Sequence, residues 1–244
     1  MMRTTIRLMI GFTCLSFLDV TNAGSMGDVH SGSLSYRGIL PFASIEAFPV
    51  WVAYGNVTYS QPGYASTTKR TALSGGGRVA AGFAYPYTAN IDLTAEAGWN
   101  YFGQKSIKTY YNTFGNSVSL SGVDSLVGFA IKKNNFECFL KAGALFQVTS
   151  YNIAYINSST SPSYNLHWNG VISDILPEVK VGSTYNINKN WGVSLAFMHA
   201  FGTSPQLNIA AISTSAGQSY NIVADMNGPS LNAIQIGARY QFAN

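Results

Sequence analysis

The last residues of the chain alternate between apolar and polar side chains, and this alternation restricts the fold more than any other feature of the sequence. Every second position from Phe242 back to Ile234 carries an aromatic, aliphatic or small side chain, whereas the positions between them carry no large apolar side chain. A period of two is the side-chain period of a β-strand. The pattern therefore predicts a terminal strand with one apolar face and one polar face.

The first residues have the composition of a secretion signal. Two arginines, Arg3 and Arg7, precede an apolar run from Leu8 to Leu18, and a small residue, Ala23, follows. A run of that length is too short to cross a bilayer, which takes about 20 residues. We therefore expect a signal peptide at 1–23, an irregular periplasmic lead-in at 24–47 and a single β domain at 48–242.

The composition favours a protein whose outer surface faces lipid. Charged residues make up 10% of the chain, whereas a soluble domain has about 25%. The net charge of +4 is too small and too scattered for a nucleic-acid-binding protein. Beyond the signal no apolar run is long enough for a transmembrane helix, so a membrane-spanning chain would have to form a closed barrel. Only Cys138 remains after removal of the signal, and no intramolecular disulfide is expected.

Strand-like alternation recurs inside the chain. In the clearest segment, 91–102, Leu93 and Trp99 share a face opposite Asp92 and Glu96. A helix would place those charges beside the apolar stripe, so we predict a strand. Similar segments lie at 77–87, 123–131, 136–148, 177–185 and 191–201, and a weaker one lies within 48–59. With the terminal strand the count is eight, each close to the length of about 9 to 11 residues that a barrel strand needs to cross a membrane.

The connections between these segments alternate in length. Short ones at 86–90, 132–135 and 186–190 alternate with long ones at 60–71, 103–120, 149–172 and 202–229. Short periplasmic turns alternating with long extracellular loops are typical of an up-and-down membrane barrel. We therefore predict an all-β fold, a transmembrane antiparallel up-and-down β-barrel with eight strands. Ten strands are the alternative, if the long loops contain a further hairpin.

The polar faces of the predicted strands carry charges of both signs. They are Arg78, Glu96, Asp124, Glu137, Lys141, Glu178, Lys180 and Arg239. The interior of an eight-stranded barrel is only wide enough for its own side chains, and buried charges are costly unless they pair. The sequence predicts an ion-paired network in the lumen, in which Glu178 neutralises a lysine. A conducting or proton-relaying array is the alternative.

Aromatic residues gather near the ends of the predicted strands. One group contains Tyr85, Tyr87, Trp191, Tyr240 and Phe242, and the other contains Trp99, Tyr101, Phe146, Tyr151 and Phe201. Amphipathic rings prefer the membrane interface, so two girdles are expected. The alternative is that Tyr and Trp simply favour strands.

Residues that could support catalysis or bind a cofactor are scarce. His199 and Ser204 form the nearest candidate for a nucleophile with a base, whereas His30 and His167 are isolated and show no metal-ligand spacing. The glycines at 75–77 precede a strand, so they do not form a phosphate-binding loop before a helix. We expect no catalytic site, no cofactor and no metal.

The mature chain resembles the small Gram-negative outer-membrane β-barrel superfamily, the OmpA transmembrane-domain and OmpX-like group. The segments that carry the resemblance are the signal, RVAAGFAYPYTANIDLTAEAGWNYF, YNINKNWGVSLAFMHAFG and the terminal ARYQF. The resemblance implies that Tyr240 and Phe242 form the signal read by the barrel-assembly machinery. Ala243 and Asn244 depart from the family, whose chains usually stop at the aromatic. The His199–Ser204 spacing also departs from lipid A deacylases, in which His and Ser lie two residues apart on one strand.

These features predict an integral outer-membrane protein that is not an enzyme. We expect a structural role or surface-exposed, loop-mediated binding in adhesion or host interaction, because Tyr, Ser, Asn and Gly in the long loops are typical of adaptable binding surfaces. The implied partners are outer-membrane lipid and lipopolysaccharide, the assembly machinery and a host or cell-surface ligand, with no nucleic acid. The alternatives are a small porin-like channel and a lipid A-modifying enzyme.

Overall fold

The computed structural model describes residues 38–242, apart from 62–63, 109–113, 158–163, 204–205, 215–216 and 226–227. The expected signal peptide at 1–23 and most of the expected lead-in therefore lie outside the described residues, as do His30 and Ser204. The described part of the chain contains no helix that is long and apolar enough to cross a membrane.

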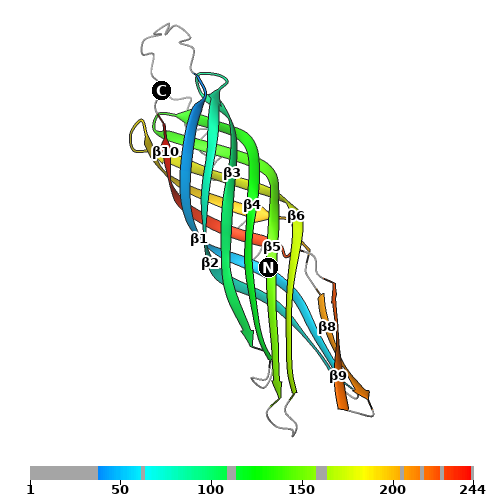
Figure 1. The fold of residues 1–244 in the computed structure, drawn as a ribbon. Coiled ribbons are helices and arrows are strands. Elements are labelled where there is room, and N and C mark those ends of the chain that lie inside the picture. The colour runs from blue at the N-terminus through cyan, green and yellow to red at the C-terminus, as the bar shows by residue number, and fades with distance from the viewer. Residues whose placement is uncertain are drawn as a thin grey trace, which may run out of the picture. The chain divides into compact units, whose positions relative to one another are not determined.

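The strands of the described residues form one sheet, and eight of them close into an antiparallel barrel (Figure 1). Its strands are β1 (Leu40–Gln61), β2 (Tyr64–Pro86), β3 (Ile91–Lys108), β4 (Phe114–Lys133), β5 (Phe136–Asn157), β6 (Tyr164–Asn186), β7 (Trp191–Ala200), β8 (Gln206–Thr214), β9 (Gly217–Asp225) and β10 (Leu231–Gln241). Strands β1 to β7 pair in sequence order, and β10 pairs with both β7 and β1. Eight strands thus form the wall, which confirms the predicted up-and-down barrel.

The strands of the wall are strongly staggered. The residues that face each other in register can be followed from one strand to the next, starting at Glu46 on β1. Through β2, β3, β4 and β5 this series reaches Asp174 on β6. In the other direction, through β10 and β7, the series reaches Thr184 on β6, ten residues further along the strand. Such a stagger requires the strands to tilt against the barrel axis.

The polarity of the wall is the reverse of that of a soluble protein. Its outer surface carries exposed large apolar side chains, such as Val79, Leu93 and Ile236, which are 47–60% exposed. Its interior holds charged side chains, such as Arg78 and Lys180, which are both 2% exposed. The polarity of the two faces alternates along β3 as the sequence predicted, with Asp92 and Glu96 buried and Leu93 and Trp99 exposed. We call the exposed apolar outer surface of the closed wall the apolar band.

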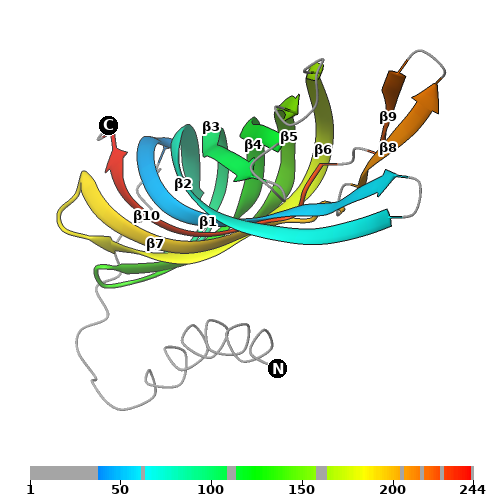
Figure 2. The same ribbon diagram turned by 90° about the horizontal axis from the view of Figure 1, so that it is seen from below.

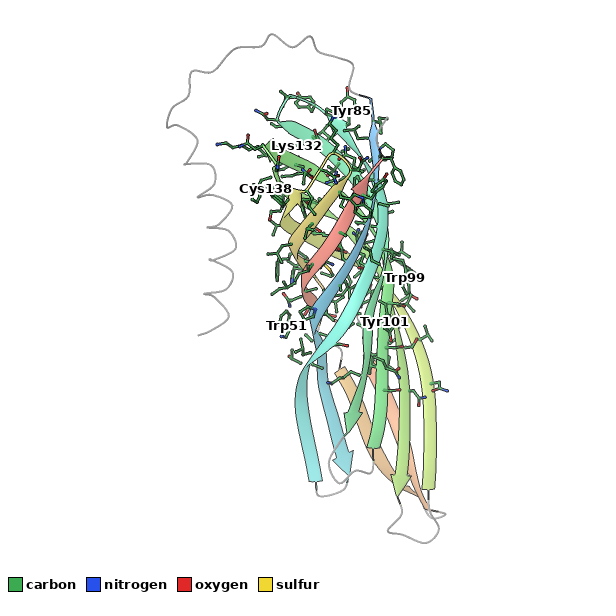
Figure 3. The ribbon with its side chains drawn as sticks, turned by 90° about the vertical axis from the view of Figure 1, so that its left-hand side faces the viewer. Trp51, Tyr85, Trp99, Tyr101, Lys132 and Cys138 are labelled. Atoms are coloured by element: carbon green, nitrogen blue, oxygen red, sulfur yellow. The ribbon has the colours of Figure 1, made fainter. Side chains whose placement is uncertain are left out.

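Aromatic side chains mark the two edges of the apolar band. Tyr85 lies near the end where the short turns are, and Trp51, Trp99 and Tyr101 lie further along the wall (Figure 3). Tyr151 does not belong to the second group, although the sequence suggested it. Its side chain is half-buried and packs against an apolar cluster inside the barrel, because it lies on the same inward face of β5 as Gln147.

The first strand begins eight residues before the predicted boundary at 48. β1 starts at Leu40 and pairs with β10 from Phe42↔Gln241 onward, so part of the expected lead-in belongs to the barrel. Both faces of β1 carry apolar side chains: Phe42 and Phe48 are buried in the lumen, and Ile45 is exposed outside. The period-two signal is therefore obscured on this strand.

Most of the predicted long loops are strands. β3 and β4 stay paired to Lys108↔Gly115, and β5 and β6 stay paired to Asn157↔Tyr164. The expected loop at 202–229 contains the hairpin β8–β9, whose first strand pairs in parallel with β1. The further hairpin allowed for in the ten-strand alternative thus exists, but it lies outside the closed wall. Beyond the apolar band neither face must be apolar, so backbone pairing continues without the alternation that revealed it elsewhere.

The sheet divides in two beyond the closed wall (Figure 2). Pairing between β2 and β3 stops at Gly77↔Tyr101, and pairing between β6 and β7 stops at Glu178↔Ala200. Strands β3 to β6 continue as one four-stranded sheet, and β2, β1, β8 and β9 form another. We call these two sheets the extension, which comprises the described residues of 53–76, 102–121, 148–177 and 206–225. The division coincides with a β-bulge at Gly103, whose φ of +87° favours glycine.

Candidate functional site: the barrel lumen and its two ends

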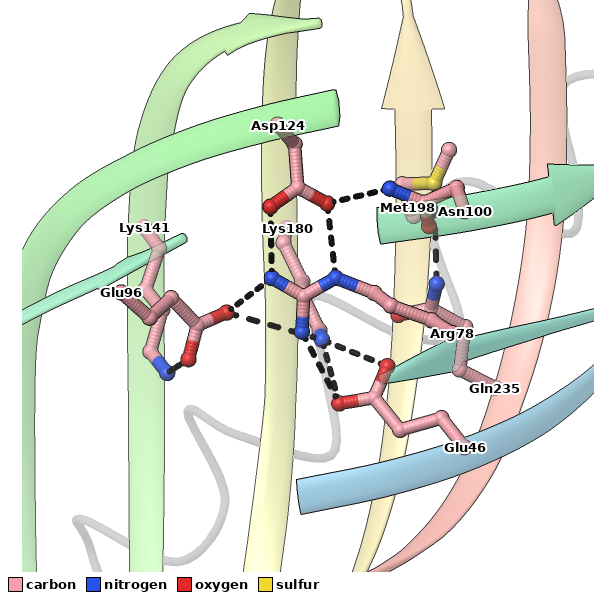
Figure 4. A network of polar contacts seen from close by, with 9 residues as sticks. All are labelled: Glu46, Arg78, Glu96, Asn100, Asp124, Lys141, Lys180, Met198 and Gln235. Atoms are coloured by element: carbon pink, nitrogen blue, oxygen red, sulfur yellow. Dashed lines mark hydrogen bonds and ion pairs between the residues drawn. The ribbon is translucent and has the colours of Figure 1, made fainter. Parts of the chain in front are cut away.

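Arg78 is the centre of an ion-pair network inside the barrel (Figure 4). Its Nε and Nη2 donate to the two carboxylate oxygens of Asp124 at 2.6 and 2.7 Å. Nη2 also donates to Glu96 at 2.9 Å, and Nη1 donates to Glu46 at 3.3 Å. A Cβ on Gly98 would lie only 2.7 Å from the Arg78 Nε, so this glycine leaves the space that the guanidinium occupies. The planar guanidinium thus contacts three carboxylates from three strands.

Two lysines complete the network. Lys141 donates to Glu96 at 2.6 Å, and Lys180 donates to both oxygens of Glu46 at 2.8 Å. The network therefore contains three cations and three anions, all nearly buried. Pairing of this kind offsets the desolvation of the charges and ties β1 to β6 across the lumen.

Glu46 is the member that sequence reasoning missed. It lies in the segment expected to be an irregular lead-in, where the alternation of apolar and polar residues around Ile45 and Ala47 is weak. The structure pairs Glu46 with Arg78 in the register of β1 and β2, so both side chains point into the lumen. The signal that could have found it is the position of a lone carboxylate between outward-facing apolar residues.

Glu178 does not neutralise a lysine, contrary to the prediction. Its side chain is buried, and its Oε2 has no hydrogen-bond partner among the described residues. Lys180, two residues away on the same face, pairs with Glu46 instead. Because the three cations of the network already balance three other carboxylates, Glu178 is an acidic group in excess of the cations of the network.

Arg239 lies outside the central network, nearer the short turns. It donates to Glu137 at 2.6 Å, and its guanidinium carbon lies 4.2 Å from the centre of the Phe42 ring. Its Nε and Nη2 are buried without a partner. Lys132 and Asp92 form a further ion pair close to the same end. The predicted charges thus fall at two separate levels of the lumen.

An apolar layer closes the lumen where the closed wall meets the base of the extension. Its buried members are Phe48, Val50, Val52, Phe102, Val118, Leu120, Leu145, Leu176, Met198, Ala200, Leu231 and Ala233. Phe48 and Phe102 come from opposite sides of the β2 strand and approach to 5.9 Å between ring centres. Each of these side chains is at most 4% exposed, so the layer has the packing of a protein core.

The link between β9 and β10 folds onto this apolar layer. The Gly228 amide donates to the Asp174 carboxylate at 2.9 Å, and the Ala53 amide donates to the Ser230 carbonyl at 3.0 Å. Gly228 and Pro229 are both buried. These contacts fasten the base of the β8–β9 hairpin to β1 and β6.

His199 lies on the outer surface of the barrel and not in an enclosed site. Its Nδ1 is 2.9 Å from the Asn232 Oδ1, directly across the β7–β10 pair, and its ring packs edge-on against Phe201 at 4.2 Å. Ser204, its proposed partner, lies outside the described residues. Among the residues that the structure describes, no group of three His, Cys, Asp or Glu side chains could hold a metal ion.

Tyr240 and Phe242 sit at the seam where β10 closes the barrel against β1. Trp191, Tyr240 and Phe242 form a row of edge-on rings with centre distances of 4.9 and 5.1 Å. The Phe242 amide donates to the Pro41 carbonyl at 2.9 Å. The role of these two aromatics as an assembly signal stays a prediction.

Comparison with known proteins gives similarity of structure and not of sequence. No family model matches the chain, and no curated protein matches it. Ail, the attachment invasion locus protein of Yersinia pestis solved with the heparin analogue sucrose octasulfate, is 10% identical, covers 84% of this chain and 99% of its own, and gives a TM-score of 0.42.

Two further solved structures are similar to the same degree. The outer membrane protease OmpT from Escherichia coli is 10% identical, covers 88% of this chain and 100% of its own, and gives a TM-score of 0.43. The outer membrane protein AlkL is 12% identical, covers 91% of this chain and 97% of its own, and gives a TM-score of 0.43. At these identities none of the three assigns an activity to this chain.

Proposed function

We propose that this protein is an integral outer-membrane barrel that presents the extension outside the cell as a non-catalytic binding surface. The reversed polarity of the wall is the observation that carries the membrane assignment. A band of exposed apolar side chains around a charged, paired interior is stable in hydrocarbon and unstable in water. The outer leaflet would then supply lipopolysaccharide around the band, and the signal peptide and assembly machinery would deliver the chain there.

The lumen supports a structural role in preference to a channel. An ion moving through it would have to displace the Arg78 network and then cross the apolar layer around Phe48 and Leu145. Neither layer offers a hydrated path, and each charge of the network is already neutralised. We therefore infer that the barrel anchors the extension and does not conduct.

The extension supports binding through its sheet edges. On β6 the Pro177 carbonyl accepts the Phe201 amide, on the side of the strand away from β5. In an antiparallel sheet the backbone N–H and C=O of every second residue point to the same side, so the backbone groups of the odd-numbered residues of β6 point away from β5. The next outward amide, that of Ile175, is taken by the Asp174 side chain at 2.8 Å. Further along, from Ser173 to Tyr164, no described strand pairs with this edge. We call residues 164–173 the β6 edge.

The β6 edge lacks the features that normally prevent edge-to-edge pairing. Its sequence, YNLHWNGVIS, contains no Lys, Arg, Asp, Glu or Pro, and no bulge interrupts its pairing with β5. Long edge strands of this kind are templates for another polypeptide. We propose that the partner is a protein that adds an extended strand to the β6 edge, with main-chain hydrogen bonds supplying the affinity. The host or cell-surface ligand expected from the sequence would then bind as an added strand, through main-chain hydrogen bonds to this edge.

A proline substitution at the β6 edge tests this proposal. Ser173→Pro removes one outward amide without breaking a β5–β6 hydrogen bond, because the odd positions face away from β5. Ser173→Ala is the matched control, since it loses the same hydroxyl and keeps the amide. Cells displaying the proline variant should lose adhesion or serum resistance while the alanine variant keeps them. Equal behaviour of the two variants would contradict edge pairing.

The lipid A-modifying enzyme receives less support. The His199 Nδ1 is already engaged by Asn232, and the ring lies on the outer surface without a described carboxylate beside it. Mass spectrometry of lipid A from cells expressing the protein should therefore show no modification. A modification that His199→Ala abolishes would overturn the non-catalytic assignment.

A further inference from the structure

A polar cavity opens at the end of the barrel opposite the extension. Its volume is about 360 Å³, and it lies where the β4–β5 turn, the β6–β7 turn and the end of β10 meet. The side chains that the argument uses are those of Lys132, Asn135, Asn186, Asn188, Lys189 and Gln241. We call this space the turn-end cavity.

The lining of the turn-end cavity is rich in donors and carries no carboxylate. Two of the lining residues are lysines and the other polar ones are amides. The Asn188 Oδ1 accepts the amides of Asn190 and Trp191 at 2.9 and 2.8 Å. Because the oxygen of Asn188 is used in this way, the remaining capacity of its side chain is the donating NH2 group.

Backbone hydrogen bonds hold the three lining segments together before any ligand arrives. The Asn186 amide donates to the Asn135 carbonyl, and the Gln241 amide donates to the Asn190 carbonyl, each at 2.7 Å. The Asn190 side chain also donates to the Gln241 carbonyl at 2.9 Å. A cavity fixed in this manner loses little conformational entropy on binding.

Hydrogen-bond donors continue inward from the cavity. Arg239 lies two residues before Gln241 on the same inward face of β10 and is 7% exposed. Its Nε and Nη2 are buried donors without a partner in the described part of the chain. The nearest described carboxylates, Glu137 and Asp92, are already paired with Arg239 and Lys132. Buried donors without partners are uncommon in native structures and indicate an absent acceptor.

We infer that the turn-end cavity binds a phosphate group. The ammonium group of Lys189 and the amide NH2 groups of the other lining segments match the oxygens of a tetrahedral anion. Lys189 offsets part of the charge of the anion, whereas Lys132 is already paired with Asp92. The lining residue Lys132 lies at the same end of the barrel as Tyr85 (Figure 3), and Trp191 begins β7 directly after the β6–β7 turn, which carries lining residues of the cavity. Lipid headgroups would meet the barrel at this level. The phosphate can thus come from a phospholipid headgroup or from solution. The inference does not depend on the partner proposed for the extension.

The test uses the refolded full-length barrel in a phosphate-free maltoside detergent. Inorganic phosphate is titrated at constant ionic strength against a chloride reference, and amide chemical shifts are followed at Asn188, Lys189 and Trp191. Lys189→Gln should weaken binding about tenfold or more, since it removes one charge-assisted contact. The matched control is Lys133→Gln, which removes the same charge from an exposed neighbour of the cavity and should leave the affinity within about twofold.

A second arm identifies the source of the phosphate. Short-chain phosphatidylglycerol is titrated beside inorganic phosphate and glycerol phosphate. Binding of the lipid about tenfold tighter than either soluble compound assigns the site to a headgroup, whereas equal binding assigns it to a free anion. The absence of saturable shifts with all three compounds would overturn the inference. Equal weakening by Lys189→Gln and Lys133→Gln would overturn it too, because the effect would then be general electrostatic attraction.

Discussion

The closed wall and the extension are built from the same strands, yet they meet opposite demands. In the wall every strand is paired on both sides, and β1 closes against β10 from Phe42 to Val52. In the extension the sheet splits, and the β6 edge has no described partner strand. Unpaired backbone is intolerable in hydrocarbon and merely hydrated in water. The sheet thus needs to be closed only along the apolar band. Beyond it the extension would be in water, where unpaired strand edges are tolerated and stay free for binding.

The wall should depend most strongly on its central cation. Arg78→Ala leaves the carboxylates of Glu46, Glu96 and Asp124 without their shared partner, so we expect a loss of about 3 to 5 kcal/mol in the free energy of unfolding. Urea unfolding in lipid vesicles, followed by tryptophan fluorescence, measures it. Lys105→Ala is the control in the extension, where the exposed Nζ only reaches the Leu73 carbonyl at 3.5 Å. Equal losses for the two variants would remove the distinction between wall and extension.

The second largest loss in the free energy of unfolding should come from a substitution in the apolar layer. Leu145 is fully buried, and Leu145→Ala should cost about 2 to 5 kcal/mol by losing apolar burial and leaving a cavity. The same unfolding assay applies, with Leu140→Ala as a control, since Leu140 points outward on the same strand. If Leu140→Ala proved the more damaging, the lumen would not be the packed core of the barrel.

Sequence alone predicts the wall well because lipid and lumen impose opposite polarity on successive residues. The inward Asp92 and Glu96 and the outward Leu93 and Trp99 show this on β3. The same reasoning fails on β1, where the apolar Phe42 and Phe48 share the inward face with Glu46. The inward face of this strand is therefore not recognisable as polar from the sequence. An aromatic residue near a strand end can also point inward, depending on which face of the strand it occupies. Tyr151 was assigned to the outer girdle, although it lies on the inward face of β5.

The extension and the candidate sites were less accessible to sequence reasoning. Along most of the extension the sequence shows no clear period-two alternation of apolar and polar residues, so its strands were predicted as loops. Which carboxylate meets which cation depends on the stagger of the wall, and this explains why Lys180 reaches Glu46 rather than Glu178. The turn-end cavity joins Lys132, Lys189 and Gln241, which lie on separate turns and strands and become neighbours only when the barrel closes.

Two buried glutamates offer a finer test inside the wall. Glu178→Gln should change the free energy of unfolding by less than about 1 kcal/mol or stabilise the barrel, because it removes a surplus carboxyl that pairs with no described cation. Glu96→Gln is the matched control and should destabilise by more, since Glu96 accepts from Lys141 and Arg78. Thermal unfolding of the two variants side by side measures the difference. A larger loss for Glu178→Gln would restore the predicted pairing of Glu178 with a lysine.

The smallest effect on stability should come from removing the β8–β9 hairpin. The Thr203 amide donates to the Gly228 carbonyl at 3.0 Å, so a short Gly-Ser linker can replace 204–227 without moving the ends. We expect the free energy of unfolding, measured with urea, to change by no more than ordinary surface substitutions do, about 0.5 kcal/mol. Failure of this variant to refold into vesicles would show that the extension is part of the folding unit of the wall.

Amide hydrogen exchange of β6 in lipid bilayers tests the central claim most directly, because this one strand runs through both regions. From 178 to 184, where β5 and β7 pair with it on both sides, all amides should be protected. From 165 to 173 protection should alternate, with even-numbered residues slow because they face β5 and odd-numbered residues fast because they face the free edge. Uniform protection from 165 to 173 would contradict the open edge, and uniform rapid exchange there would contradict the extension itself.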